Sequence, residues 1–122
     1  MQYKLYNDDF DIIIDSKGCE IISVVRKQDS KQYIWNGNPD AWKRHTPVLF
    51  PLVGRYKNDT SVYKGKEYHM TQHGFARDSE FTLVHKEDNV IIMSLTSSEA
   101  TKQKYPFDFE LMITCLLYTS PS

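Results

Sequence analysis

The sequence predicts an all-β fold made of antiparallel hairpins. Short runs rich in β-branched and aromatic residues are separated by turn pairs containing Gly, Asn or Asp. No segment sustains the 3.6-residue period of an amphipathic helix. The chain has 122 residues, which is a one-domain length, and it contains neither internal repeats nor a low-complexity linker. We therefore expect one β domain.

The first half of the chain is expected to form four short strands. They fall at residues 3–6, 10–14 and 19–25, with turns at 7–9 and 16–18, and at residues 33–35. Asn38-Pro39 has the character of a helix cap followed by a first-turn proline, so residues 39–44 are expected to form a helical turn.

The second half is expected to contain two hairpins and a further strand. Lys64-Gly65 lies between apolar pairs at 62–63 and 68–70, which is a strong hairpin signal. Residues 80–86 alternate, with Phe81, Leu83 and His85 on one face, and they precede a strand at 90–95. His85 is accordingly expected to be a partly buried packing residue. A polar loop then leads to a strand at 107–113.

Composition excludes several classes of protein. The net charge is −1 and the basic residues are scattered, so we expect no nucleic-acid partner. The longest apolar runs have four or five residues, too few for a membrane span. The N-terminus lacks the apolar region of a secretory signal, and we expect a cytoplasmic protein whose cysteines, Cys19 and Cys115, stay reduced and buried.

Two blocks place polar side chains directly after apolar, strand-like runs. Residues 47–55 read Pro-Val-Leu-Phe-Pro-Leu-Val-Gly-Arg, and residues 72–78 read Gln-His-Gly-Phe-Ala-Arg-Asp. Each block carries a glycine beside an arginine or a histidine. Polar groups at the ends of rigid elements are where binding sites are usually built.

These blocks give the chain a resemblance to the aldose 1-epimerase (mutarotase) family, in its bacterial branch. Further matching pieces are Gly18-Cys19-Glu20, residues 33–35, residues 42–47 and Tyr105-Pro106-Phe107. The likeness extends over residues 2–114. It implies the N-terminal part of a large antiparallel β-sandwich, the galactose mutarotase-like supersandwich, of which this sequence covers less than half.

The tail departs from the family pattern. We expect residues 1–114 to be the N-terminal portion of the sandwich domain, and residues 115–122 to be a truncated or non-native end. A folded copy of this portion alone would leave sheet edges and apolar faces uncovered.

The resemblance implies an isomerase that interconverts the α and β anomers of an aldose by acid/base ring opening. In the family the base is a glutamate and the acid a histidine, both in the later part of the chain and both absent from this sequence. The positions that match here are Arg55 and His73, which bind and orient the sugar, and His73 also polarises the ring oxygen. Arg77 is expected to reach a hydroxyl or a phosphate.

Each of these residues has a plainer interpretation. His73 follows Gln72 and precedes a glycine, which argues against a place in the core. Arg55 has the alternative of a solvated loop arginine, and Arg77 that of an ion pair with Asp78 or Glu80.

Two aromatic residues complete the expected sugar site. Trp42 and Phe75 offer rigid apolar faces on which a sugar can stack, and the alternative for both is packing in the core or the site wall. Trp35 is expected in the core.

No metal or cofactor is expected. His69 and His73 have the spacing of a helical zinc pair, but the hairpin before them and Gly74 after them indicate strand and loop. Proton transfer on a hemiacetal requires no redox group. Gly65-Lys66 lacks the upstream glycine of a phosphate-binding loop, and no Gly-x-Ser-x-Gly occurs.

Three hypotheses stay open on the sequence. The first is an aldose 1-epimerase-type isomerase in an incomplete chain, itself inactive. The second is a non-catalytic carbohydrate-binding protein of the same fold. The third is an unrelated small β interaction module. A small-molecule sugar, either a hexose or a hexose phosphate, is the partner in the first two, and the oligomeric state is not indicated by any seam in the sequence.

Overall fold

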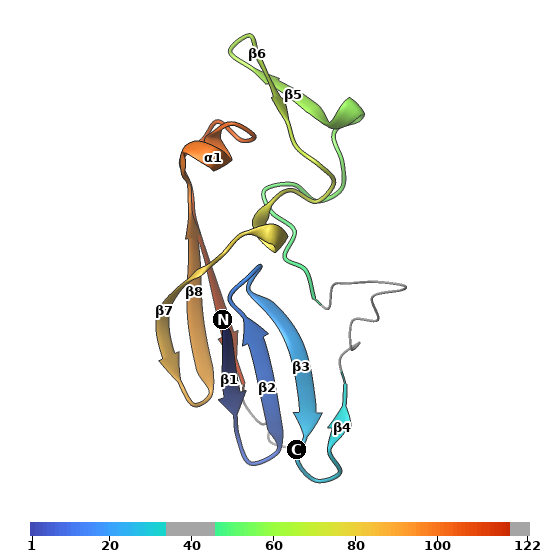
Figure 1. Ribbon diagram of the computed structural model, residues 1–122, viewed down its shortest axis with the longest axis vertical. Coiled ribbons are helices and arrows are strands. Elements are labelled where there is room, and N and C mark those ends of the chain that lie inside the picture. The colour runs from blue at the N-terminus through green and yellow to red at the C-terminus, as the bar shows by residue number, and fades with distance from the viewer. Residues whose placement is uncertain (34–45, 118–122) are drawn as a thin grey trace.

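The structure is a computed structural model that describes residues 1–33 and 46–117. Within these residues, nine strands form three antiparallel sheets. Two of the sheets lie side by side in the lower body of the molecule, and a small hairpin projects from its upper end (Figure 1). The all-β, antiparallel fold class expected from the sequence is confirmed.

The first sheet is a meander of four strands built from the N-terminal residues. Its β1–β2 turn is fixed by Asn7, whose Oδ1 accepts the backbone N–H of Asp9 at 2.9 Å and of Phe10 at 2.8 Å. A register shift between Ile13 and Ile14 bends β2 against β3. In chain order the strands are β1 (Gln2–Tyr6), β2 (Phe10–Asp15), β3 (Glu20–Arg26) and β4 (Lys31–Gln32).

The second sheet has three strands in the order β7-β8-β9. They are β7 (Thr82–Glu87), β8 (Val90–Thr96) and β9 (Glu110–Leu116). On β8, Ile91, Met93 and Leu95 are buried and alternate with half-buried residues. Their register partners on β9 are half-buried apolar residues, so this face of the sheet is turned toward the core.

The core lies between the two sheets and continues upward under residues 70–76. Leu5 and Ile14 from the first sheet join Ile91 and Met93 from the second, and all four are at most 1% exposed. The remaining buried members are Cys19, Met70, Phe75, Ala76, Phe81 and Leu95. Because residues from both sheets share one cluster, the body behaves as a single packed unit.

The projecting hairpin consists of β5 (Thr60–Tyr63) and β6 (Lys66–His69). Its two-residue turn is Lys64-Gly65, with φ of 51° and 78°. Two consecutive positive φ values are the mark of a type I′ turn, whose twist suits a hairpin. The hairpin expected at Lys64-Gly65 is confirmed.

One short helix occurs where the sequence indicated only a polar loop. It is α1 (Glu99–Lys102), preceded by Ser98, whose Oγ accepts the N–H of Thr101 while the Thr101 hydroxyl accepts the N–H of Ser98. This reciprocal cap satisfies donors that a short helix otherwise leaves unpaired. Among the described residues, no helix is long and apolar enough to cross a membrane.

Several strands have other bounds than the sequence suggested. A short strand, β4, lies at Lys31–Gln32, before the expected strand at 33–35, of which only Tyr33 lies within the described residues; the Tyr33 N–H donates to Val24 O at 2.8 Å. β9 begins at Glu110 instead of residue 107, because the Phe107 ring packs on Tyr63, with centroids 4.7 Å apart, outside any ladder. The expected helical turn at 39–44 and the residues Trp35 and Trp42 lie outside the described residues.

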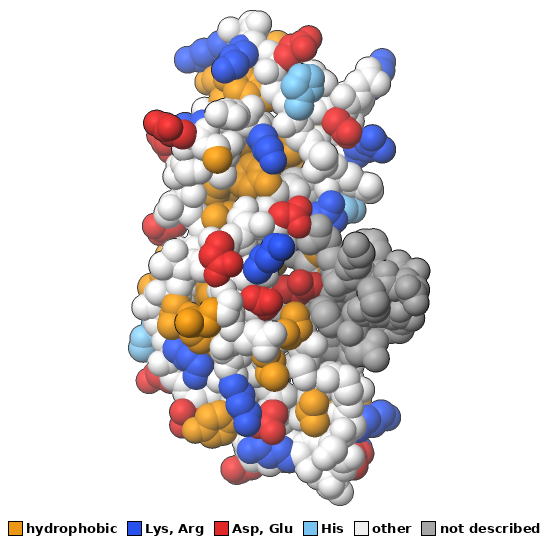
Figure 2. All heavy atoms as spheres, viewed as in Figure 1, with side chains coloured by type: hydrophobic (Ala, Val, Ile, Leu, Met, Phe, Trp, Pro, Cys, Tyr) orange, Lys and Arg blue, Asp and Glu red, His pale blue; other side chains and the backbone are white. Residues whose placement is uncertain are grey.

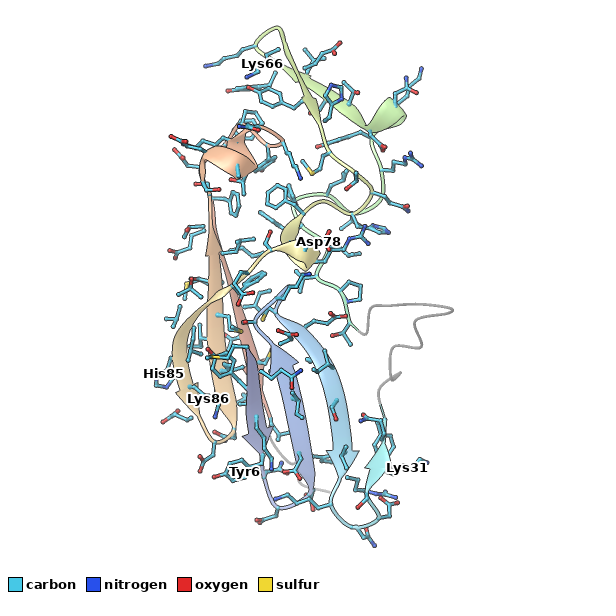
Figure 3. All side chains as sticks on the ribbon, in the orientation of Figure 1. Tyr6, Lys31, Lys66, Asp78, His85 and Lys86 are labelled. Atoms are coloured by element: carbon cyan, nitrogen blue, oxygen red, sulfur yellow. The ribbon has the colours of Figure 1, made fainter. Side chains whose placement is uncertain are left out.

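The expected place of His85 is wrong. A register shift between Leu83 and His85 interrupts the alternation on β7, and the His85 side chain is 52% exposed. It points away from the sheets into solvent (Figure 3), where its Nε2 lies 3.4 Å from Glu87 Oε2. Only Phe81, just before the strand, is buried as the pattern suggested.

Cys19 and Cys115 are free thiols that meet in the body. Cys19 is buried and donates a hydrogen bond to the Cys115 sulfur. This bond, together with burial, raises the pKa of Cys19. The same hydrogen bond lowers the pKa of Cys115 to about 7 against the opposing effect of burial.

Candidate functional site

The two expected sugar-binding residues are brought together by Gly54. The Gly54 N–H donates to Nδ1 of the His73 ring at 2.9 Å, and the His73 N–H donates to Gly54 O at 2.7 Å. Arg55 follows Gly54 directly in the chain. The reciprocal pair therefore fixes the backbone from which Arg55 extends relative to the His73 imidazole, although 19 positions separate Gly54 and His73 in sequence.

The loop around His73 depends on backbone that only a few residue types adopt easily. His73 has φ of 66°, and Gly74 after it has φ of 76°. A Cβ on Gly74 would lie 2.4 Å from Phe50 O, because this glycine packs directly on the backbone of that residue. Phe50 O accepts the N–H groups of Phe75 and Ala76, both at 3.1 Å. The histidine loop is thus joined to the middle of the 47–55 block by backbone contacts.

The hydrogen bond from Gly54 determines the tautomer of His73. Since Nδ1 accepts a backbone N–H, the neutral ring carries its proton on Nε2. His73 is half-buried, so part of the residue stays accessible to solvent. What His73 offers to a ligand is a single oriented N–H donor.

Arg55 is oriented by a carboxylate four residues further along the chain. Its Nε donates to Asp59 Oδ1 at 2.7 Å, and its Nη2 donates to Asp59 Oδ2 at 3.0 Å. The hydrogen bonds from Arg55 lower the pKa of Asp59, and those to Asp59 raise the pKa of Arg55. This two-pronged contact holds the plane of the guanidinium and leaves its Nη1 donors for another acceptor.

Asp59 is a site residue that sequence reasoning missed. It belongs to the 3₁₀ turn Lys57–Asp59, in which Asn58 and Asp59 have φ of 56° and 54°. Its backbone O also accepts the Met70 N–H at 3.0 Å, which joins the turn to the end of the hairpin. The four-residue spacing from Arg55 was the available signal, but that spacing indicates contact only on a helix.

Arg77 occupies a different place from Arg55 and His73. Its Nη2 donates to Gln72 O at 2.8 Å, so the side chain folds back over the histidine loop. Its backbone O is the atom that a Cβ on Gly18 would meet, at 2.5 Å. Arg77 lies in the 3₁₀ turn η2 (Ala76–Asp78), beside the labelled Asp78 in Figure 3. This arrangement gives Arg77 a role in bracing the loop, and the expected contact of Arg77 with a hydroxyl or a phosphate stays a prediction.

Of the two aromatic candidates, the structure describes one. Phe75 is 8% exposed, and its ring packs against Phe50 and Phe109 with centroids 6.4 and 5.9 Å away. It therefore supports the site from the core side and does not present an open face for stacking. Trp42 lies outside the described residues, and its role stays a prediction.

An aromatic cluster continues from this support to the surface. Phe50 and Phe107 both pack against the Tyr105 ring, with centroids 6.3 and 5.0 Å away, and Phe107 reaches Tyr63 on the hairpin. Phe107 and Tyr63 are 40% and 38% exposed. Figure 2 shows hydrophobic side chains gathered on the face between the hairpin and α1. They connect the hairpin to the body.

Within residues 1–33 and 46–117, no three His, Cys, Asp or Glu side chains group in a way that would hold a metal ion. The His69 Nδ1 lies 3.1 Å from the Thr60 hydroxyl across the hairpin. The site as described is made of hydrogen-bond donors, which suits an uncharged polar ligand or an anion.

Comparison with known proteins identifies the family. The family model for aldose 1-epimerase matches residues 1–119. The chain belongs to the aldose 1-epimerase family. This excludes the hypothesis that the resemblance is incidental. The match includes β9 and extends to residue 119, while the nature of residues 115–122 stays a prediction.

Solved structures of the family agree over nearly the whole chain. A galactose mutarotase related enzyme from Lactobacillus acidophilus is 42% identical with a TM-score of 0.95, over 97% of this chain and 39% of that protein. A galactose mutarotase-like protein from Lactobacillus casei is 35% identical with a TM-score of 0.92, over 97% of this chain and 40% of its own length. This chain therefore has the galactose mutarotase-like fold over the part of that fold that it covers.

Curated relatives show the same difference in length. The plasmid-borne protein LacX of Lactococcus lactis is 28% identical over 96% of this chain and 40% of its own length. The chain thus spans about 40% of the length of the relatives it matches.

Proposed function

We propose that this chain supplies the sugar-orienting part of an aldose 1-epimerase, with Arg55 and His73 as its ligand contacts. The observation that carries the proposal is the reciprocal pair between Gly54 and His73. It places an oriented imidazole N–H beside the backbone from which Arg55 extends. Family membership makes an aldose the substrate class, and free hexoses and hexose phosphates are both included.

The reaction requires proton transfer at two oxygen atoms of one sugar. A base removes the proton from the anomeric hydroxyl while the bond from C1 to the ring oxygen breaks, and an acid protonates that ring oxygen. The aldehyde then turns about the C1–C2 bond, and closure with the roles reversed gives the other anomer. Negative charge develops on the ring oxygen as the bond breaks.

His73 suits the site where this charge develops. Its Nε2–H is held in place through the Gly54 bond to Nδ1, so a donor needs no reorganisation when charge appears. Oriented donors of this kind favour the transition state over the bound sugar. The proposed role of His73 is to polarise the ring oxygen.

Arg55 suits the sugar hydroxyls. Asp59 takes up Nε and Nη2 and leaves the Nη1 donors to bind oxygen atoms of the sugar, or a phosphate in a phosphorylated substrate. Asp59 also balances the charge of the arginine and keeps its plane fixed. We assign Asp59 as the residue that positions Arg55.

The glutamate base and the histidine acid implied by the family come, in this proposal, from polypeptide outside the present sequence. The 122-residue chain alone is then expected to lack epimerase activity. A cytoplasmic location, where free and phosphorylated hexoses are found, is part of the same proposal.

A fusion protein tests the proposal. The chain is joined to the part of the Lactobacillus acidophilus relative that lies beyond its match, and mutarotation of α-D-glucose and α-D-galactose is followed by polarimetry. We expect the fusion to accelerate mutarotation over buffer and the 122-residue chain alone to give the buffer rate, with the intact relative assayed in parallel as the reference.

Two histidine variants make the test specific. In the fusion, His73→Gln is expected to lower kcat/KM by about 10- to 100-fold, the range for loss of a hydrogen bond to a charged group. His85→Gln, at the exposed position on β7, is the matched control and should leave the rate unchanged. A folded fusion with equal rates for both variants would refute the role of His73. Sugar binding without acceleration would favour the carbohydrate-binding alternative.

A further inference from the structure

Two histidines four positions apart, His69 and His73, lie at the two ends of the segment that follows the hairpin. His73 holds the backbone before Arg55 through the reciprocal pair with Gly54. His69 is the last residue of β6 and is exposed, and its Nδ1 lies 3.1 Å from the hydroxyl of Thr60 across the hairpin. The function proposed above makes no use of this second histidine.

The direction of the contact between His69 and Thr60 follows from the other hydrogen bond of the hydroxyl. Thr60 Oγ1 donates its one proton to Asn58 O at 2.9 Å. Toward His69 the same oxygen can therefore only accept, so Nδ1 of the His69 ring carries a proton. The neutral rings of His69 and His73 then hold opposite tautomers, with the proton on Nδ1 in His69 and on Nε2 in His73.

The hydrogen bond from Thr60 ends on a turn that needs support. Asn58 and Asp59 have φ of 56° and 54°, and residues other than glycine adopt this left-handed conformation singly, not in succession. Two such residues together persist only where neighbouring groups hold them. The Thr60 hydroxyl bonds to the carbonyl of Asn58, and the Met70 N–H bonds to the carbonyl of Asp59 at 3.0 Å. The turn is thus held by residues at the base of both hairpin strands.

The hairpin brings these groups together before any ligand binds. Thr60 and His69 are register partners in the β5–β6 ladder, where the Cβ atoms of facing residues are about 4.5–5.5 Å apart. Met70 is 3% exposed and belongs to the core. The base of the hairpin is therefore fixed to the body through Met70, while Thr60 and His69 brace the turn at the surface.

The turn positions the carboxylate that holds Arg55. Asp59 accepts from Nε and Nη2 of Arg55 at 2.7 and 3.0 Å, and its left-handed backbone sets the direction in which the carboxylate points. A turn that relaxed to an ordinary conformation would aim this carboxylate elsewhere. Both ends of the arginine are thus held from one segment: its backbone through the pair at His73, and its guanidinium through the contact of His69.

We propose that Thr60 and His69 are positioning residues of the sugar site, which set the direction of the Arg55 guanidinium through the turn at Asn58-Asp59. Their role rests on the proposed function, in which Arg55 binds the sugar. Neither residue is proposed to touch the sugar. Their loss should weaken sugar binding and spare the chemical step, because the Nη1 donors of a mobile arginine no longer point at fixed oxygen atoms.

The first measurement uses the unmodified 122-residue chain, isotopically labelled. A long-range NMR correlation between the carbon-bound protons and the nitrogens of each imidazole identifies the nitrogen that carries the proton. It is recorded in alkaline solution, where histidine side chains are neutral. We expect the proton on Nδ1 of His69, in contrast to Nε2 of His73. A His69 ring protonated on Nε2 would overturn the proposal, since Thr60 would then receive no donor.

Matched variants of Thr60 separate the effect of the hydroxyl from that of side-chain volume. Thr60→Val keeps the shape and removes both hydrogen bonds, so it should broaden the Arg55 Nε–H signal and return the pKa of Asp59 toward its ordinary value. Thr60→Ser keeps a hydroxyl and should retain both signals of the parent. Thr82→Val, the same replacement at an exposed threonine of β7, is the control and should change neither. An unchanged Arg55 signal in Thr60→Val would overturn the proposal.

His69→Phe removes the donor and keeps a ring in its place. It should loosen Arg55 less than Thr60→Val does, because the Thr60 hydroxyl still bonds to Asn58 O. An unchanged Arg55 signal in His69→Phe would overturn the role of His69. A loss in Thr60→Ser as large as that in Thr60→Val would overturn the role of the hydroxyl.

Kinetics of the fusion protein separate this proposal from the proposed function. Thr60→Val should raise KM for the sugar by about 2- to 10-fold, the range for loss of one hydrogen bond, with kcat nearly unchanged and Thr60→Ser at the parent value. A fall in kcat at unchanged KM would overturn the positioning role. A fusion that gives only the buffer rate would refute the proposed function. The NMR signals of Arg55 and Asp59 need no sugar, so they still decide whether Thr60 and His69 hold the arginine.

Discussion

The histidine loop and the body of the molecule are held in place by different interactions. His73 is fixed by two hydrogen bonds with Gly54, and the loop lies on Phe50 through a glycine that leaves no room for a side chain. In the body, Ile91 and Met93 are fully buried between two sheets and make no polar contact through their side chains.

Because of this difference, the stability of the fold and the orientation of the site residues have separate sources. Burial of apolar side chains is non-directional, and it tolerates changes of shape better than changes of volume. Backbone hydrogen bonds fix orientation closely but contribute little net stability, and a positive φ at a residue other than glycine, such as His73, costs free energy. The body therefore provides the free energy of folding, and the loop uses part of it to hold Arg55 and His73 in one arrangement.

The largest effect is expected from a cavity in the body. Ile91→Ala should lower the free energy of unfolding by about 2–5 kcal/mol, because a fully buried side chain is lost from a close-packed core. Val84→Ala on the exposed strand β7 is the control and should change stability by less than about 0.5 kcal/mol. Urea denaturation followed by circular dichroism measures both. Similar values for the two variants would contradict the assignment of the core.

A somewhat smaller effect is expected from Gly74→Ala. The new Cβ would lie 2.4 Å from Phe50 O and 2.6 Å from Phe50 C at a residue with φ of 76°, so the backbone must move. We expect a loss of about 3 kcal/mol together with altered NMR signals of the His73 ring.

Gly65→Ala separates the clash from the backbone conformation. Gly65 has nearly the same φ, 78°, but no atom lies within 4 Å of the position of its Cβ. Its replacement should cost about 1 kcal/mol, the strain of a left-handed residue alone, and leave the His73 signals in place. Equal losses for the two glycine variants would mean that the contact with Phe50 does not position the loop.

The sequence allowed the body to be predicted better than the site. β1, β2, β3 and β8 lie within one or two residues of their expected positions because alternation and turn residues are local signals. The Lys64-Gly65 turn is equally local, since its two residues and their neighbours suffice to favour a type I′ geometry.

The errors arise where contacts distant in sequence decide. Phe107 and Phe109 look like the start of a strand, but their rings pack on Tyr63, Tyr105 and Phe50. β9 consequently begins only at Glu110. On β7 the register shift turns His85 outward, and no local pattern announced it.

For the candidate site, the two sequence blocks pointed to Arg55 and His73 as candidates, and their role stays a prediction. The blocks did not reveal the pair between Gly54 and His73, which joins residues 19 positions apart. Asp59 was missed because its carboxylate reaches Arg55 only through a turn in which two residues have positive φ. Such conformations depend on the surrounding fold, which residue identity alone does not reveal.

The smallest effect is expected at the ion pair that orients Arg55. Hydrogen bonds from Arg55 lower the pKa of Asp59 below its ordinary value. The pair therefore stabilises the fold fully above the ordinary pKa of an aspartate. Its contribution is lost as the pH falls through the lowered pKa of Asp59. Both side chains are partly exposed, so the change in stability should be small.

The orientation of the Arg55 side chain is thus a more sensitive measure of this ion pair than the stability of the fold. In an NMR titration of the carboxyl carbons, Arg55→Gln should return the pKa of Asp59 toward its ordinary value. Asp59→Asn should release the Arg55 side chain and broaden its Nε–H signal while the Gly54–His73 pair stays intact.

The control is Arg26→Gln, which removes the partner of Asp29. In the unmodified chain the hydrogen bond from Arg26 lowers the pKa of Asp29 to about 2. It should raise the pKa of Asp29 and leave that of Asp59 unchanged. An Asp59 that titrates normally in the unmodified chain would show that Arg55 is not held, and the loop would then orient the imidazole alone.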